Sequence, residues 1–211
     1  MALRILPFRQ YDDNDVVNLF GALDSDVLDN TTAAGDGDAG VFVKVASGNF
    51  NLDPVSYSAN DYLGKTDYSH VGRAQYPGVN LRFEPATTGA AVLGLTLLQT
   101  AKNDENGEKL LYNPQKAAEL QSAIPGQAVP VASKGIFTIF NTAFEDNADF
   151  APGRRFKISS NAGKVTGLAA NANNDPLAIG SILGTGERMA APSNRQTDQF
   201  SGKYAIVQLG L

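Results

Sequence analysis

The residue with the clearest capacity for acid–base chemistry is the only histidine of the chain, His70. Catalytic triads and most zinc sites need an imidazole, and Asp67 and Ser69 lie close to it in the sequence. Side chains at positions i, i+2 and i+3 of a loop or strand rarely converge, and no Gly-x-Ser-x-Gly turn accompanies them. We therefore interpret His70 as a surface or interface histidine.

A polar, glycine-rich loop at 24–40 offers the next set of chemical groups. Asp24, Asp26 and Asp29 open it, and Asp36 and Asp38 lie near its end. Calcium prefers such carboxylate oxygens on flexible backbone. Neither group has the glycine and glutamate spacing of a twelve-residue calcium loop, or the register of calcium-binding nonapeptide repeats. A solvated loop is the favoured interpretation, and calcium binding at 24–40 stays open.

Three other carboxylates leave one enzymatic alternative open. Glycosidases hold two carboxylates apart in a cleft, and Glu84, Glu145 or Asp149 could form such a pair. The chain has no cysteine, which excludes disulfides, thiolate metal sites and a cysteine nucleophile. The Gly-x-Gly at 184–186 lacks the third glycine of a dinucleotide-binding loop. We expect a protein that is not an enzyme and has no catalytic, metal or cofactor-binding residues and no cofactor.

Composition narrows the class of protein further. The 211 residues are 43% hydrophobic and 18% charged, so the chain can bury a core. Its formal net charge of −5 argues against a nucleic-acid partner, because phosphate neutralisation needs an excess of Lys and Arg. No apolar run is long enough to cross a bilayer, and the start lacks a secretory signal pattern. We expect no membrane partner and synthesis in a cytoplasm.

The clearest structural pattern lies in the last third of the chain. Apolar residues alternate at 136–140 and again at 156–158, as in strands that bury one face. Pro152-Gly153 and Asn161-Ala162-Gly163 supply tight-turn chemistry between the strands. Further strands are expected at 163–166, 179–183 and 204–209. These segments predict a small C-terminal β-barrel at 127–211.

The first 126 residues predict an irregular β region with an N-terminal arm and one or two short helices. Asp13, Asn14 or Asp15 could cap a helix that continues towards Leu23, and Asn113-Pro114 begins a clearer helix that runs to 121. Strands are expected at 41–46, 79–83 and 92–100. The Asn106-Gly107 turn predicts a hairpin whose second strand is 109–112. Pro125-Gly126, followed by 129–131, marks the expected boundary, although the two parts could share a core.

The order of the C-terminal segments also resembles a known family. Gly135-Ile136-Phe137-Thr138-Ile139, Gly163-Lys164-Val165-Thr166 and the terminal strand at 204–209 are similar to the small β-barrel of head decoration, or cement, proteins of tailed bacteriophages. The similarity covers 134–209, and the opening at 3–20 resembles the start of virion structural proteins of cyanophage-like phages. It implies a mainly β virion protein that binds the major capsid protein at the capsid surface and forms a homotrimer.

A decoration protein would act through surface contacts, for which the arginines, the tyrosines and the N-terminal arm are the candidates. Pro7 suits an edge strand or an arm laid on a partner, and tyrosines give large contact areas at low entropic cost. Other virion parts, from tail, neck or fibre, share these features and remain an alternative, with a carboxylate-dependent glycoside hydrolase less favoured. The predicted contact residues are Leu3, Arg4, Ile5, Pro7, Phe8, Arg9, Tyr11, Tyr57, Tyr62, Tyr68, Arg154 and Arg155.

Overall fold

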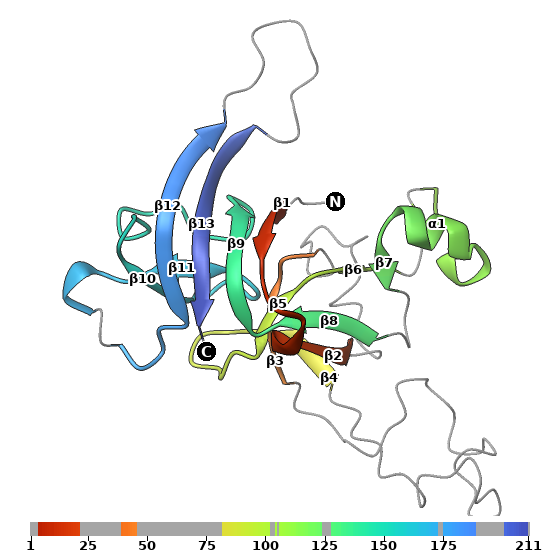
Figure 1. The fold of residues 1–211 in the computed structure, drawn as a ribbon, viewed down its shortest axis with the longest axis horizontal. Helices are drawn as coiled ribbons and strands as arrows, with labels where there is room; N and C mark the ends of the chain where they lie inside the picture. Colours follow the sequence, from red (N-terminus) through yellow and green to blue (C-terminus); the bar gives the residue numbers. More distant parts are fainter. Residues whose placement is uncertain are drawn as a thin grey trace, which may run out of the picture.

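A computed structural model describes residues 4–21, 39–45, 82–101, 104, 106–123, 128–172, 175–188 and 201–210. The fold is mainly β, which confirms the predicted class. Two strand systems contain most of the described strands, a six-stranded sheet and a set of five strands whose pairings close on themselves (Figure 1). We call them the large sheet and the ring.

The large sheet contains the predicted C-terminal strands and one strand from the N-terminus. Every neighbouring pair in it is antiparallel. Strand β1 from the N-terminal part lies at one edge, and β11 lies at the other. In order across the sheet, the strands are β1 (Ile5–Gln10), β9 (Lys134–Phe140), β13 (Gly202–Gly210), β12 (Gly180–Arg188), β10 (Arg155–Ile158) and β11 (Val165–Gly167).

The ring corrects the predicted position of the barrel. The C-terminal strands form the open large sheet, whereas the closed set of pairings is built mainly from N-terminal strands. Only the β2–β4 pair within the ring is parallel. In order around the ring, the strands are β2 (Val16–Gly21), β4 (Arg82–Pro85), β3 (Phe42–Val45), β5 (Gly94–Thr96) and β8 (Ala128–Ala132).

One bent ribbon of two chain segments belongs to both strand systems. The segment β1–β2 runs antiparallel to β8–β9, with β1 paired to β9 and β2 paired to β8. At the bend, the amide and hydroxyl of Ser133 both donate to the carbonyl oxygen of Asp15, at 2.8 and 2.9 Å. The predicted boundary near 126 therefore does not separate the two systems, because β1 and β8 each lie in the system built mostly from the other side of that boundary.

The hydrophobic core also spans both systems. One cluster of buried side chains includes Phe137 and Phe156 from the large sheet and Phe42 and Leu95 from the ring. The rings of Phe42 and Phe156 meet edge to face, with centroids 6.2 Å apart. Each such buried aromatic or aliphatic side chain contributes about 1.5–3 kcal/mol to folding. A second cluster fills the ring itself and includes Leu19, Val41, Val43, Phe83, Val129 and Val131.

The helix expected after Asp12 is a strand instead. Only one turn of 3₁₀-helix forms, η1 (Asp13–Asp15), and Asp12 caps it by accepting from the Asn14 amide at 2.8 Å. Strand β2 follows at once, because β-branched Val16 and Val17 favour extended backbone and the residues alternate between faces. Within β2, Leu19 is buried and Val17 is 40% exposed.

The middle of the chain follows the prediction in part. Asn113 accepts from the Lys116 amide at 3.3 Å and caps the expected helix, α1 (Pro114–Glu119). The tight turn ending at Gly107 forms with a φ of +85°, but 109–112 does not continue as a strand. Its last residues form the 3₁₀ turn η4 (Leu110–Tyr112).

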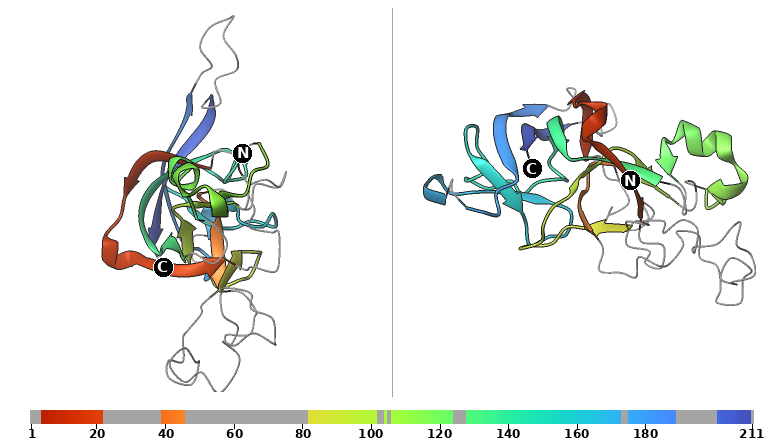
Figure 2. Two further views of the ribbon diagram at one scale, coloured as in Figure 1. Left: turned by 90° about the vertical axis from the view of Figure 1, so that its right-hand side faces the viewer. Right: turned by 60° about the horizontal axis from the view of Figure 1, so that its bottom comes forward.

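The smaller elements complete the arrangement. The strand expected at 92–100 divides into β5 and β6 (Gln99–Thr100), and the latter pairs in parallel with β7 (Ser122–Ala123). A 3₁₀ turn, η5 (Ala170–Ala172), follows β11. Both views in Figure 2 show the arrangement from other sides, with α1 beside the ring and far from β10 and β12 in the right-hand view.

Gly135 lies near the bend of the ribbon, and its backbone leaves no space for a side chain. Its φ is +137°, and a Cβ there would lie 2.6 Å from the Gln10 carbonyl oxygen and 2.9 Å from the Tyr11 Cβ. Gly89 also has a positive φ, +80°, but no atom lies within 4 Å of a Cβ built there. An alanine at Gly89 would therefore meet backbone strain without the steric overlap present at Gly135.

We predict that Gly135→Ala lowers the free energy of unfolding by about 2–4 kcal/mol, since strain and overlap act together. Gly89→Ala should cost only about 1 kcal/mol, because strain acts alone. Urea denaturation of both variants measures the difference. Equal losses at the two positions would contradict a tightly closed bend at Gly135.

Candidate partner-binding surface

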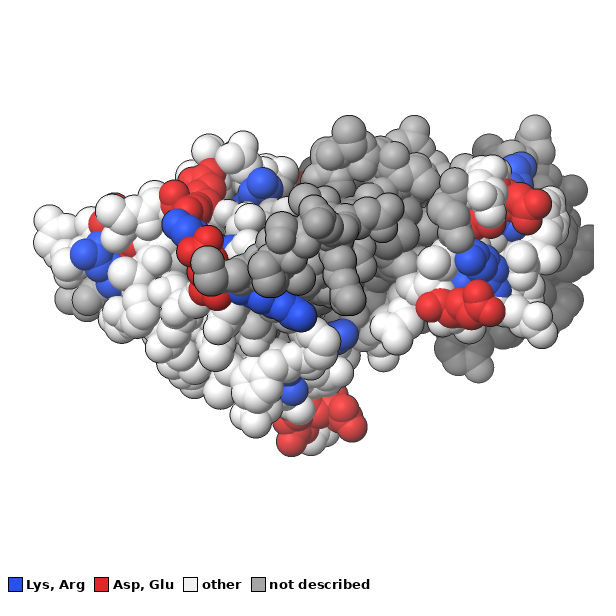
Figure 3. Space-filling model, turned by 90° about the horizontal axis from the view of Figure 1, so that it is seen from above, with Lys and Arg blue, Asp and Glu red and all other residues white. Residues whose placement is uncertain are grey.

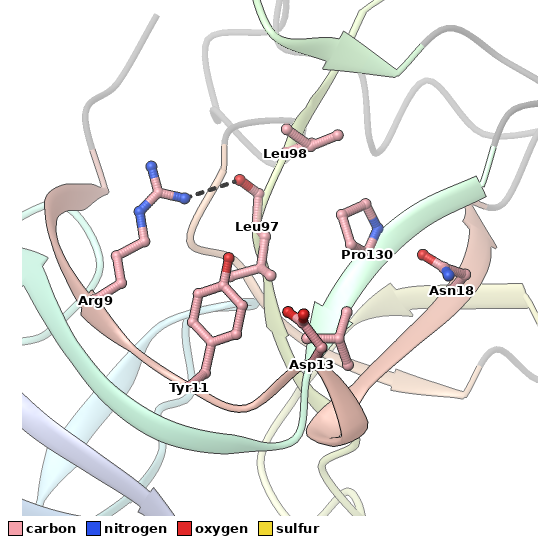
Figure 4. A pocket seen from close by; sticks show the side chains of 8 residues that line it. Arg9, Tyr11, Asp13, Asn18, Leu97, Leu98 and Pro130 are labelled. Atoms are coloured by element: carbon pink, nitrogen blue, oxygen red, sulfur yellow. Dashed lines mark hydrogen bonds between the residues drawn. The ribbon is translucent and has the colours of Figure 1, made fainter.

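An open groove of about 400 Å³ lies where the ribbon passes from the large sheet to the ring. Figure 4 shows Arg9, Tyr11 and Asp13 on the side formed by β1 and η1, with Leu98 and Pro130 across from them. The side chains in the groove divide into apolar residues and polar residues of both charges. They are Arg9, Tyr11, Asp13, Val16, Asn18, Leu97, Leu98 and Pro130.

Pro130 explains why Arg9 lies in this groove. The register of β5 with β8 places Leu97 opposite Pro130, and the Leu97 amide donates to the Pro130 carbonyl at 2.9 Å. Proline has no N–H, so Pro130 cannot return the second bond of this antiparallel pair. The Arg9 guanidinium supplies the missing donor, with Nη1 3.4 Å from the Leu97 carbonyl oxygen. Arg9 thereby ties β1 of the large sheet to the ring.

Tyr11 forms the adjoining wall. Its ring stacks on buried Phe137, with centroids 6.0 Å apart and an interplanar angle of 18°. The absence of a side chain at Gly135 lets Tyr11 approach the strand, because a Cβ there would lie 2.9 Å from the Tyr11 Cβ. Tyr11 keeps 39% of its surface exposed. The groove therefore has one aromatic side chain that the core holds in place and solvent reaches.

The structure divides the predicted contact residues of the N-terminal arm into two groups. Pro7, Phe8, Arg9 and Tyr11 reach the surface to different extents, and Phe8 is 51% exposed. Arg4 and Ile5 are only 2% and 7% exposed, so they do not present a contact surface. They are buried because β1 pairs with β9 of its own chain rather than lying free as an arm.

The arginines after the Pro-Gly turn bond within the chain. Arg154 pairs with the Asp149 carboxylate at 2.5 Å, and Arg155 donates to the Ala178 carbonyl at 3.4 Å. The fold itself thus supplies Arg154 with an acidic partner. Leu3, Tyr57, Tyr62 and Tyr68 lie outside the described residues, as do His70 and nearly all of the acidic loop at 24–40.

The carboxylates of the enzymatic alternative have separate partners. Glu84 pairs with Lys44 at 3.0 Å, across the β3–β4 ladder. Glu145 accepts from the Ser159 hydroxyl and, at 2.8 Å, from the Asn161 side-chain amide. Asp149 bonds to Arg154. Each carboxylate therefore fixes a local feature of the fold.

Charge on the surface is mixed rather than concentrated. On the face in Figure 3, acidic and basic side chains lie in small groups of both signs among uncharged residues. Within the described ranges, no three His, Asp or Glu side chains come together as a metal-binding group. No helix in those ranges has the length and apolar character of a membrane span. Comparisons with known protein families, curated proteins and solved structures find no match.

The sequence indicates Arg9 of β1 and the adjacent Tyr11 as surface residues, but not Asp13 beside them or the residues across the groove. It indicates Asp13 only as a helix cap and Pro130 only as part of a boundary. The available signal was Pro130 itself, since a proline inside a strand leaves a carbonyl on the neighbouring strand without its donor. That signal depends on knowing which strand lies beside it.

We predict that Arg9→Met lowers the free energy of unfolding by about 1–2 kcal/mol, because the Leu97 carbonyl loses its donor. In a Pro130→Ala background the residue-130 amide can donate instead, so the same substitution should cost much less. Denaturation of the four proteins of this double-mutant cycle gives the coupling. Equal costs of Arg9→Met in both backgrounds would show that Arg9 does not replace the missing amide.

The ion pair between Asp175 and Lys157 gives a prediction on the pH dependence of stability. The Leu177 amide, 2.9 Å from Oδ1 of Asp175, and the Lys157 ammonium, 3.1 Å from Oδ2, lower the pKa of the Asp175 carboxyl below its ordinary value. A lowered carboxyl pKa stabilises the fold above the pKa of the unfolded chain, and this contribution is lost as pH falls through the folded-state value. Asp175→Asn should therefore be less stable than the parent at pH 7, and this deficit should shrink as pH falls below the ordinary carboxyl pKa. A deficit that stays unchanged in acid would contradict a role of the charge.

Proposed function

We propose that this chain is a virion structural protein, a capsid decoration (cement) protein that binds the major capsid protein at the surface of a phage head. The observation that carries the proposal is the groove between the large sheet and the ring, an open surface with apolar and charged residues that the described core holds in position. The similarity of the strand order at 134–209 to phage cement proteins supports the same function.

The proposed mechanism is burial of surface rather than chemistry. The carboxylates that could act in a glycosidase are Glu84, Glu145 and Asp149, and each bonds to another side chain of this chain. We therefore propose that the protein is not an enzyme, binds no cofactor and has no nucleic-acid or membrane partner. Several copies, as in a homotrimer, would multiply weak contacts with the shell through effective concentration.

The edges of the large sheet favour contact through side chains. At the β1 edge, Pro7 lacks an amide and the register is irregular between Ile5 and Arg9, two features that discourage addition of another strand. At the β11 edge, the segment before β10 lies close, since a Cβ on Gly167 would be 2.2 Å from the Asp149 backbone. Of the two roles expected for the N-terminal segment, an edge strand or an arm laid on a partner, β1 takes the first within its own fold.

We predict that the purified protein saturates expanded empty heads of its cognate major capsid protein at a fixed ratio of copies to capsid subunits. Co-sedimentation with quantified gel bands measures the ratio, and isolated tails serve as the control particle. Binding to tails but not to heads would identify another virion component instead. Turnover of a polysaccharide that is lost on Glu145→Gln would favour a glycoside hydrolase.

A further inference from the structure

Arg9 differs in its partners from the cations of the described chain that form ion pairs. Its guanidinium is half-buried and bonds to the neutral carbonyl of Leu97, and no described carboxylate lies within 4.0 Å of it. Six of the other described cations each have an acidic side chain of their own chain within that distance, whereas Arg4 and Arg155 also donate to backbone carbonyls. The six are Lys44, Lys116, Lys134, Arg154, Lys157 and Lys203.

The hydrogen bond to the Leu97 carbonyl leaves much of the hydrogen-bonding capacity of the Arg9 guanidinium unused. At 3.4 Å the contact with the Leu97 oxygen is longer than the usual 2.7–3.2 Å of an N–H···O bond. A guanidinium has five N–H donors in a plane, and a carboxylate can accept two of them in short, charge-assisted bonds. An incoming carboxylate would therefore bind Arg9 more strongly than the carbonyl does.

The rest of the groove limits what can carry that carboxylate. Val16, Leu98 and Pro130 supply apolar surface beside Arg9, and Leu97 lies buried beneath them. Asp13 adds a negative charge to the same groove, which repels a polyanion such as nucleic acid but tolerates one isolated acidic group. The charges and apolar residues together fit a peptide segment in which an acidic side chain adjoins apolar ones.

We propose that this groove receives an extended segment of a partner protein, with an Asp or Glu side chain on Arg9 and the next apolar side chains against Leu98 and Pro130. The identity of the partner as the major capsid protein rests on the proposed function, whereas the chemistry of the segment does not. Recognition would depend on the charge of Arg9, and Tyr11 would cover one side of the bound segment.

A short peptide tests the chemistry without the shell. The probe is acetyl-Glu-Leu-Leu-amide, and acetyl-Gln-Leu-Leu-amide is the matched neutral control. Titration into the isotopically labelled protein should shift the Arg9 Nε–H and Tyr11 ring resonances, with at least fivefold weaker binding of the neutral peptide. No shift at millimolar peptide, or equal binding of the two peptides, would overturn the proposed recognition.

Binding to heads tests the partner. Arg9→Met in the Pro130→Ala background should bind heads about tenfold more weakly than Pro130→Ala alone. In that background the amide of residue 130 donates to the Leu97 carbonyl, so the fold no longer depends on the Arg9 donor. Lys109→Met in the same background is the control for net charge, since Lys109 is exposed and lies outside the groove. Equal head binding by the Arg9 and Lys109 variants would overturn the groove as the contact while leaving the decoration function standing. A parent protein that binds no heads would instead refute the proposed function, and the peptide titration would still decide the chemistry of the groove.

Discussion

The two hydrogen bonds from Ser133 to the Asp15 carbonyl hold together a bend on which the rest of the fold depends. On one side of the bend, β1 and β9 belong to the large sheet, and on the other side β2 and β8 belong to the ring. Neither strand system is completed by a continuous stretch of chain. The hydrophobic core follows the same plan, since Phe42 of the ring packs against Phe156 of the sheet. We therefore regard the described strands as one cooperative unit.

The groove is a consequence of this bend. Where the ribbon changes from one system to the other, the β5–β8 ladder loses a donor at Pro130, and Arg9 crosses from β1 to replace it. Tyr11 is held next to Arg9 by its stacking on Phe137. The residues proposed to recognise a partner are thus also residues that join the two systems. A bound segment would contact both at once, which suits a protein whose proposed task is to resist deformation of a shell.

Much of the strand content could be predicted from the sequence, because alternation is a local signal. Phe137 and Ile139, or Phe156 and Ile158, alternate with less buried neighbours, and the structure buries all four. The location of the closed pairings could not be predicted, since it depends on contacts between distant strands such as β2 and β8. The helix expected after Asp12 failed for a related reason, because capping residues fit a single 3₁₀ turn as well as a longer helix.

The candidate site was predictable on one side only. Arg9 and Tyr11 could be chosen as surface groups of an edge strand, but Leu97 and Pro130 come from strands whose position the sequence does not reveal. Arg154 was predicted to contact a partner protein, but in the fold it bonds to the carboxylate of Asp149, only five residues away. The sequence therefore locates the cations but does not show which of them the fold pairs with an acidic side chain.

A cryo-EM map of expanded empty heads saturated with the protein tests the central claim most directly. Our account predicts ordered density of this fold on the outer surface of the shell, with the groove between β1, η1 and β8 turned towards the capsid protein and occupied by a segment of it. Heads without added density would contradict the decoration function. Bound copies with the groove facing solvent would contradict the account of how the protein binds.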